Sequence, residues 1–245
     1  MSVARLRQVL LLITFIPWCW LAMMVVHECG HVVAACITGA TIEQVVLHPL
    51  SISRTDLGEN PNPLLVSWTG ALVGSVVPLM AWALVQWCAV KWSPMVRFFA
   101  GFCQVANGVF LGFGAWTGDG DAGDLLRAGA ASWQLICFGF FAIAVGLWLW
   151  HGLGSAFALR NNPVRISWHS MAATSILFSA TVILEVLLVR VNPPTLVPRS
   201  ATFLGEPRRY RGGVDPTASH PSVLIHSQVS YRSRLRQLDP REIFC

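Results

Sequence analysis

The sequence predicts an all-α integral membrane protein, a polytopic bundle of about five transmembrane helices with a short β-hairpin-like segment after the first helix. Apolar residues make up 54% of the 245 residues and charged residues only 12%. A soluble domain usually has about 25% charged residues. Most apolar residues fall into five blocks, each near the roughly 20 residues that a helix needs to cross a bilayer. Between the first two blocks lies a segment that is too polar to span.

The five apolar blocks are the predicted transmembrane helices. They cover residues 9–38, 64–90, 95–116, 133–153 and 168–189. The first block follows Arg5 and Arg7, as the core of a signal peptide would. However, it is about twice the length of such a core, and no cleavage-type ending intervenes before residue 27. We therefore expect the first block to remain in the protein as a helix.

The segment between the first two blocks predicts the hairpin. Residues 41–47 and 51–54 have a strand-like composition on either side of His48 and Pro49. The following residues are rich in Gly, Asn and Pro, which are typical of a turn. In the second block, Gly70 and Gly74 are four residues apart, a spacing that lets transmembrane helices approach closely. We interpret these glycines as packing residues.

Two domains are predicted: a membrane-embedded domain at 1–192 and a basic tail at 193–245. The formal net charge is +5, and many of the arginines follow residue 190 among Pro, Ser and Gly. We expect the tail to be disordered and attracted to anionic lipid headgroups. It has no aromatic-basic motif, so a nucleic-acid partner is not expected. The seven cysteines form no CxxC pair, which argues against a disulfide framework.

The first block contains the sequence His27-Glu28-Cys29-Gly30-His31, an HExxH pattern. His27 and His31 are four residues apart, so on a helix they share one face and can direct ring nitrogens at one ion. Glu28 can then take a proton from water at that ion. Polar residues inside an apolar span are costly, so they are candidates for function. We predict one Zn²⁺ per chain, with His27 and His31 as ligands and Glu28 as general base.

A third zinc ligand must come from another part of the chain, because a catalytic zinc site has three protein ligands and an open position for water. Just past the third block, a glycine-rich loop holds three carboxylates: Asp119, Asp121 and Asp124. The end of the third span can bring this loop to the depth of the histidines. All three are candidates, and His48 is the runner-up. The loop lacks the spacing and the late Glu of an EF-hand, so calcium is the weaker interpretation.

These features together resemble the site-2 protease family of intramembrane zinc metalloproteases. The resemblance covers residues 23–126, and its specific part is the HECGH sequence. It places Asp121 at the position of the family's aspartate ligand. Asp124 and Asp119 stay as alternatives, because no proline precedes the aspartate and Ala122 replaces the usual glycine. Asn107 takes the place of the family's asparagine, which implies a substrate-positioning role. The chain resembles a divergent, minimal member without PDZ or CBS domains.

The resemblance implies hydrolysis of peptide bonds in or next to the transmembrane segments of single-span membrane proteins, with the active site toward the cytosol. A substrate helix would have to unwind, because a helical backbone hides its carbonyls, and the hairpin would pair with the extended strand. Arg and Lys divide almost evenly between the two sides, so charge alone does not set the orientation. The alternatives are an inactive pseudoprotease or membrane scaffold, a metal carrier, or a zinc-dependent hydrolase acting on lipid.

Overall fold

A computed structural model describes residues 3–90, 92–157 and 167–191. Within these ranges, five helices are long and apolar enough to cross a membrane, as predicted, and a short hairpin follows the first. The first helix begins at Val3, earlier than the apolar block, and the other boundaries fall within three residues of the predicted ones. The predicted tail lies outside the described residues. The five helices are α1 (Val3–Thr38), α2 (Pro63–Trp87), α3 (Ser93–Thr117), α5 (Ser132–Trp150) and α6 (Trp168–Val191).

The ends of the helices around the hairpin follow from local chemistry. After α1, Gly39 has a positive φ of 76°, a backbone conformation that residues with a β-carbon rarely adopt. α2 begins where the side chain of Asn62 accepts a hydrogen bond from the backbone N–H of Leu65 at 3.2 Å. Pro63 then occupies the first turn, where a backbone N–H would have no helical partner. These residues fix where the hairpin leaves one span and enters the next.

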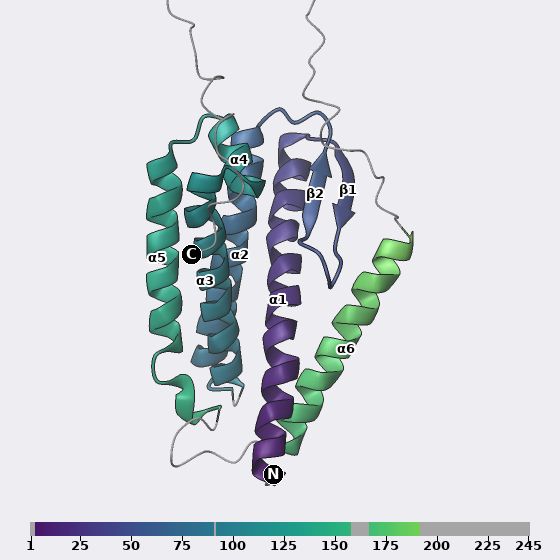
Figure 1. The fold of residues 1–245 in the computed structure, drawn as a ribbon, viewed down its shortest axis with the longest axis vertical. Helices are drawn as coiled ribbons and strands as arrows, with labels where there is room; N and C mark the ends of the chain where they lie inside the picture. Colours follow the sequence, from purple (N-terminus) through teal and green to yellow (C-terminus); the bar gives the residue numbers. More distant parts are fainter. Residues whose placement is uncertain (1–2, 91, 158–166, 192–245) are drawn as a thin grey trace, which may run out of the picture. The chain divides into compact units, whose positions relative to one another are not determined.

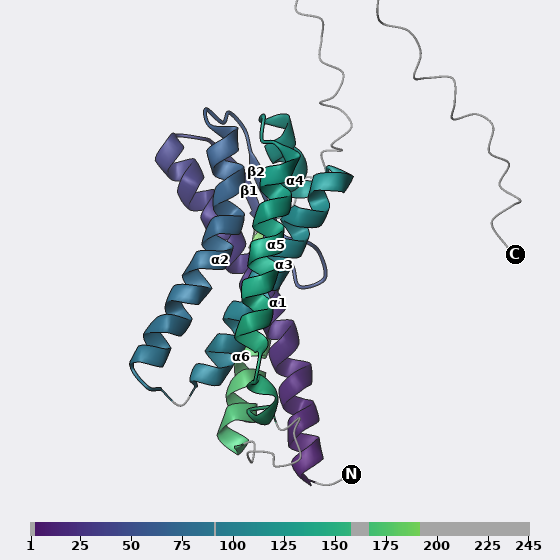
Figure 2. The ribbon, with the colours of Figure 1, turned by 90° about the vertical axis from the view of Figure 1, so that its left-hand side faces the viewer.

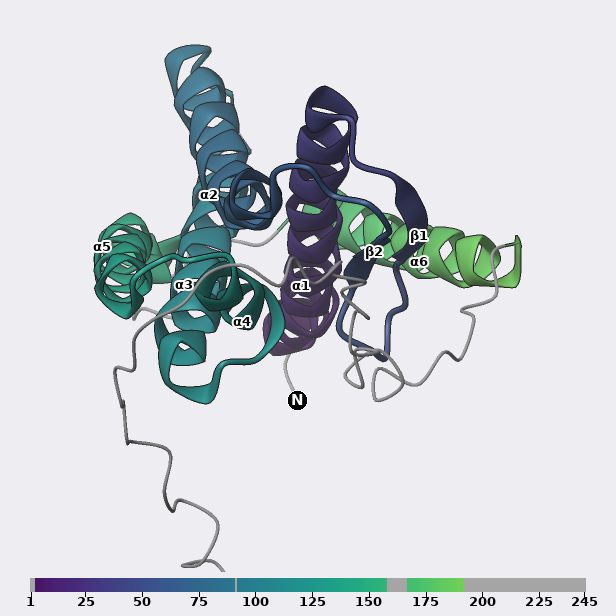
Figure 3. The same ribbon diagram turned by 90° about the horizontal axis from the view of Figure 1, so that it is seen from above.

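The hairpin consists of β1 (Ile42–Val46) and β2 (Arg54–Leu57), paired antiparallel. The second strand starts later than predicted, so residues 51–53 belong to the connection. The reason is a tight turn at His48, whose Nδ1 accepts a hydrogen bond from the backbone N–H of Leu50 at 3.1 Å. The hairpin lies beside the C-terminal part of α1, on the side away from α2 (Figures 1 and 3).

The acidic segment after α3 is a helix, α4 (Gly120–Arg127), and not the predicted loop. Gly118 ends α3 in the left-handed conformation with φ 70°, and the chain then turns directly into α4. Asp121 lies in the first turn of α4, where a carboxylate interacts favourably with the helix dipole. Ala122 and Leu125 are fully buried in a cluster with apolar residues of α2, α3 and α5. Two glycines in eight residues weaken the helix signal in the sequence.

Glycines set the closest helix contacts in the bundle. α3 packs against both α2 and α5, and α3 and α5 lie side by side (Figures 1 and 2). A β-carbon at Gly108 of α3 would lie 2.9 Å from the carbonyl oxygen of Gly139 in α5. On the other side, Gly30 of α1 meets the backbone of α2 at Thr69 and Gly70. Small residues at such contacts let transmembrane backbones approach closely.

Large apolar side chains cover the outside of the bundle. Side chains on α2 and α5 are more than half exposed, with Leu84 at 65%, Phe140 at 69% and Trp148 at 62%. Exposed apolar surface on this scale is unusual for a monomer in water and normal for one in lipid. Together with the five apolar helices, this surface is compatible with a multi-pass membrane protein.

Candidate metal centre

His27 and His31 lie near the C-terminal end of α1 and are both buried, at 8% and 6% exposure. They are one helical turn apart, so both rings project from the same face of the helix. The two Nε2 atoms are 3.1 Å apart. The HExxH spacing therefore brings two ring nitrogens to one point, as the sequence predicts.

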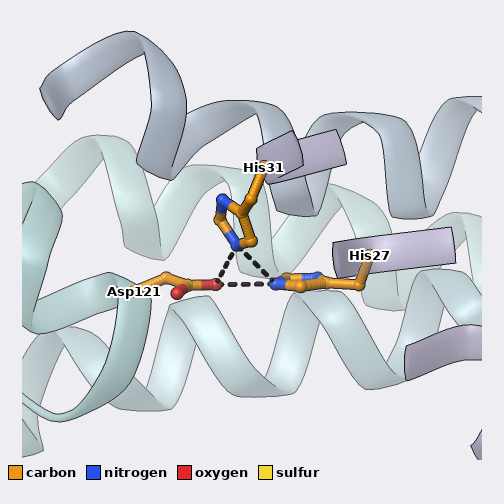
Figure 4. Close-up of side chains that lie close together, drawn as sticks. All are labelled: His27, His31 and Asp121. Carbon is orange, nitrogen blue, oxygen red and sulfur yellow. Dashed lines mark hydrogen bonds and ion pairs between the residues drawn. The ribbon is translucent and has the colours of Figure 1, made fainter. Parts of the chain in front are cut away.

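Asp121 reaches the two histidines from α4 (Figure 4). Its Oδ2 lies 2.7 Å from Nε2 of His27 and 3.2 Å from Nε2 of His31. Burial would raise the pKa of this carboxyl, but hydrogen bonds and Coulombic attraction from the two histidines outweigh burial and lower it well below its usual range. Asp121 is therefore present as a carboxylate, which is the form that binds a cation.

The contacts on the far side of each ring set its tautomer. Nδ1 of His31 faces the backbone carbonyl oxygen of Val66 at 2.8 Å, and Nδ1 of His27 faces Oδ1 of Asn107 at 2.7 Å. The amide nitrogen of Asn107 donates to the carbonyl of Cys103 at 2.8 Å. Both Nδ1 atoms therefore face acceptors and carry the hydrogen. A neutral ring then presents its Nε2 lone pair to a cation, and without a cation a proton on Nε2 lets the ring donate a hydrogen bond to Asp121.

Three electron-pair donors that converge on one point repel each other unless a cation or a proton lies between them. The three atoms are 2.7 to 3.2 Å apart. Ligands about 2.0 to 2.1 Å from a tetrahedral zinc ion would be roughly 3.3 Å apart. Two imidazoles and one carboxylate also form a common donor set for catalytic zinc. The residues fit a zinc ion after small adjustments.

The other candidate ligands lie elsewhere. Asp124 is hydrogen-bonded to Arg127, Asp119 is exposed just before α4, and His48 serves the hairpin turn. Of the described residues, the group able to hold a metal consists of His27, His31 and Asp121. Asp121 is also the residue that the family resemblance had singled out.

Asn107 lies beside the candidate metal centre, not on an open surface. It is 1% exposed, and its side chain is engaged by His27 and by the backbone of its own helix. These contacts suit a residue that orients a ligand, because a hydrogen bond to the distal ring nitrogen fixes the tautomer and the ring angle. Its predicted contact with substrate stays a prediction.

Gly70 and Gly74 contribute to the site in a way that sequence reasoning missed. A β-carbon at Gly70 would lie 2.9 Å from Nε2 of His27 and closer still to the ring of His31. A β-carbon at Gly74 would lie 2.9 Å from Nδ2 of Asn107. Their spacing indicated helix packing, and they do lie at a helix contact. The atoms packed against them, however, are the histidines and the asparagine.

Glu28 faces the hairpin. Its carboxylate is buried, at 4% exposure. One oxygen, Oε1, accepts a hydrogen bond from the hydroxyl of Ser53 at 2.7 Å, and Oε2 accepts one from the hydroxyl of Thr55 at 2.7 Å. Neither hydroxyl was a candidate from the sequence. The available signal was partial: Ser53 lies in the predicted strand 51–54 and Thr55 just after it, and residues two apart in an extended chain share one face.

The fold and this cluster define a class: a multi-pass membrane protein with a buried His-His-Asp group that fits a metal ion. No protein-family model matches the chain, and neither the curated proteins nor the solved structures contain a significant match. The resemblance to the site-2 proteases therefore remains an interpretation of the motifs.

Proposed function

We propose that the protein is an intramembrane zinc metalloprotease that hydrolyses peptide bonds in or next to the transmembrane segments of single-span membrane proteins. The observation that carries the proposal is the convergence of His27, His31 and Asp121, whose donor atoms lie within 3.2 Å of one another. This cluster is built between helices that are apolar enough to span a membrane. Glu28 follows the first histidine directly, as the HExxH pattern of metalloproteases requires.

His27, His31 and Asp121 would hold one Zn²⁺ ion. When bound, zinc supplies Lewis acidity, which favours the deprotonation of water and polarises a peptide carbonyl. Asn107 and the carbonyl of Val66 keep the two imidazoles in the ligating tautomer. The Asp121 side chain is 20% exposed, twice the exposure of the His27 side chain. We propose that water reaches the centre from the Asp121 side.

Glu28 is the proposed general base. Each of its oxygens accepts one hydroxyl hydrogen bond, and a carboxylate oxygen has a second lone pair that can still accept a proton. Glu28 would take a proton from the attacking water and return it to the leaving amine. An isolated carboxylate at this depth would be costly, so its burial beside the histidines supports a chemical role.

The hairpin is the proposed docking site for substrate. A two-stranded sheet leaves an outer edge on each strand, and an extended peptide can add to such an edge through backbone hydrogen bonds. We further propose that the metal centre and the basic tail lie on the cytosolic side, where the tail would contact anionic lipids. The orientation rests on the resemblance to the family.

The test compares the wild type with Glu28→Gln in proteoliposomes. Zinc content is measured by elemental mass spectrometry, and cleavage is followed on a panel of single-span substrates. Glu59→Gln is the matched control, since Glu59 is an exposed glutamate between β2 and α2. We expect all three proteins to bind one zinc ion and only Glu28→Gln to lose cleavage. Equal cleavage by the wild type and Glu28→Gln would refute the mechanism. A zinc-loaded wild type that cleaves none of the panel would favour the inactive-scaffold alternative.

A further inference from the structure

The hairpin and the proposed general base are directly connected. Ser53 and Thr55 are 25 and 27 residues from Glu28 in sequence, yet their hydroxyls donate to its two carboxylate oxygens at 2.7 Å each. These hydrogen bonds join α1 to the hairpin, and each oxygen has its own donor. A buried carboxylate held in this way has little freedom to rotate.

The extended chain explains why both hydroxyls reach the same group. Ser53 directly precedes β2 and Thr55 lies in it, and successive side chains of an extended chain point to opposite faces, so residues two apart share one face. Arg54 and Asp56 alternate with these two residues and therefore lie on the other face. They form an ion pair with each other at 3.0 Å. The face toward α1 thus carries hydroxyls and the opposite face carries charges. This alternation assigns the two hydroxyls to Glu28.

We propose that Ser53 and Thr55 are positioning residues for Glu28, and that their hydroxyls hold the carboxylate in the orientation in which it takes the proton. The proposal rests on the proposed function of Glu28 as general base. A hydroxyl donor satisfies a buried carboxylate oxygen without neutralising it, and leaves one lone pair on each oxygen for the proton. Without the hydroxyls, the carboxylate would be buried with unsatisfied acceptors and would leave this orientation.

The test removes one hydroxyl at a time. Thr55→Val keeps the shape of the side chain, Ser53→Ala removes the second donor, and Thr55→Ser keeps the hydroxyl. The matched control is Thr181→Val, because Thr181 lies on α6, outside the hairpin, and its hydroxyl donates to the backbone carbonyl of Leu177 in the same helix. We expect kcat to fall about ten-fold for each lost hydroxyl at unchanged KM, as for one hydrogen bond to a charged group. Zinc content should stay at the wild-type level, and Thr55→Ser should retain the wild-type kcat.

Three results would overturn the proposal. The first is an equal loss of activity in Thr55→Val and Thr181→Val. The second is a rise in KM at constant kcat, which would indicate a role in substrate binding. The third comes from thermal unfolding, which needs no substrate. If Thr55 acts through Glu28, Thr55→Val should lower the Tm of the wild type and leave the Tm of Glu28→Ala unchanged. Additive Tm shifts would refute the positioning role of Thr55 but leave the proposed protease function standing. A wild type that cleaves no substrate would refute both the proposed function and the positioning role.

Discussion

Replacing Gly70 with alanine should disable the proposed metal centre without changing any of its three proposed ligands. The new β-carbon would lie 2.9 Å from Nε2 of His27 and closer to the His31 ring, whereas ordinary contacts begin at 3.4 Å. The His27 ring would have to move by about 0.5 Å and the His31 ring by more. Metal-ligand distances tolerate only about 0.2 Å. The methyl group would therefore displace both histidines beyond the range in which they can share one ion.

The α2 helix has little room to move away from the methyl group. Its carbonyl at Val66 accepts a hydrogen bond from His31 at 2.8 Å, and Gly30 of α1 lies against its backbone at Thr69. A shift of α2 would break the contact that orients His31. We expect zinc affinity to fall at least 100-fold, beyond the 10- to 100-fold typical when only an outer partner of a ligand is lost.

Competition with a chromophoric chelator measures this loss. The matched control is Gly112→Ala, which also adds a methyl group to a glycine inside a transmembrane helix, where the closest atom would be 3.2 Å away in α5. The control should bind zinc like the wild type. If Gly70→Ala binds zinc within about three-fold of the wild type, the contact between α2 and the two rings is wrong.

Three further changes test the rest of the centre. Asp121→Asn should abolish stoichiometric zinc binding, whereas Asp124→Asn, on the same helix, should retain it; equal zinc content in the two would exclude Asp121 as the third ligand. Asn107→Leu should lower zinc affinity by about 10- to 100-fold, because His27 loses the acceptor that fixes its ring. An unchanged affinity would show that Asn107 does not orient His27 for zinc binding. Leu125→Ala should destabilise the protein by about 2 to 5 kcal/mol, since Leu125 is fully buried on the inner face of α4. Leu125→Ala should also weaken zinc binding, because α4 would shift and displace Asp121. A less stable variant that binds zinc with wild-type affinity would contradict this connection between Leu125 and Asp121.

Hydropathy was enough to predict the five spans, because each apolar block is long and the cost of exposing a backbone in lipid leaves few alternatives to a helix. The positions of His27 and His31 followed from helical periodicity alone. By contrast, α4 was expected to be a loop, because eight residues with two glycines carry a weak local signal. Its stability comes from Ala122 and Leu125, which are buried against residues of other helices.

The partners of the site were the hardest part to predict. Asn107 and Gly70 carry no local sign of a contact with His27, because these contacts depend on how three spans pack. Residue reasoning likewise left three aspartates open, and the structure distinguishes them by what each one contacts. Periodicity reports which face a residue occupies, but tertiary packing decides what lies opposite that face.

The pairing of Asp121 with His27 joins residues that are 94 positions apart. An ion held there would act as a removable cross-link, closing a loop that contains the hairpin and two complete spans. Loop closure becomes more costly only slowly as the loop lengthens, and an ion that binds only the folded chain stabilises it by mass action. During synthesis this cross-link cannot form until α4 has left the ribosome, so metal loading would follow the synthesis of α2 and α3. Chelation should then free Asp121 from the histidines of α1, while Ala122 and Leu125 keep α4 packed against the other helices.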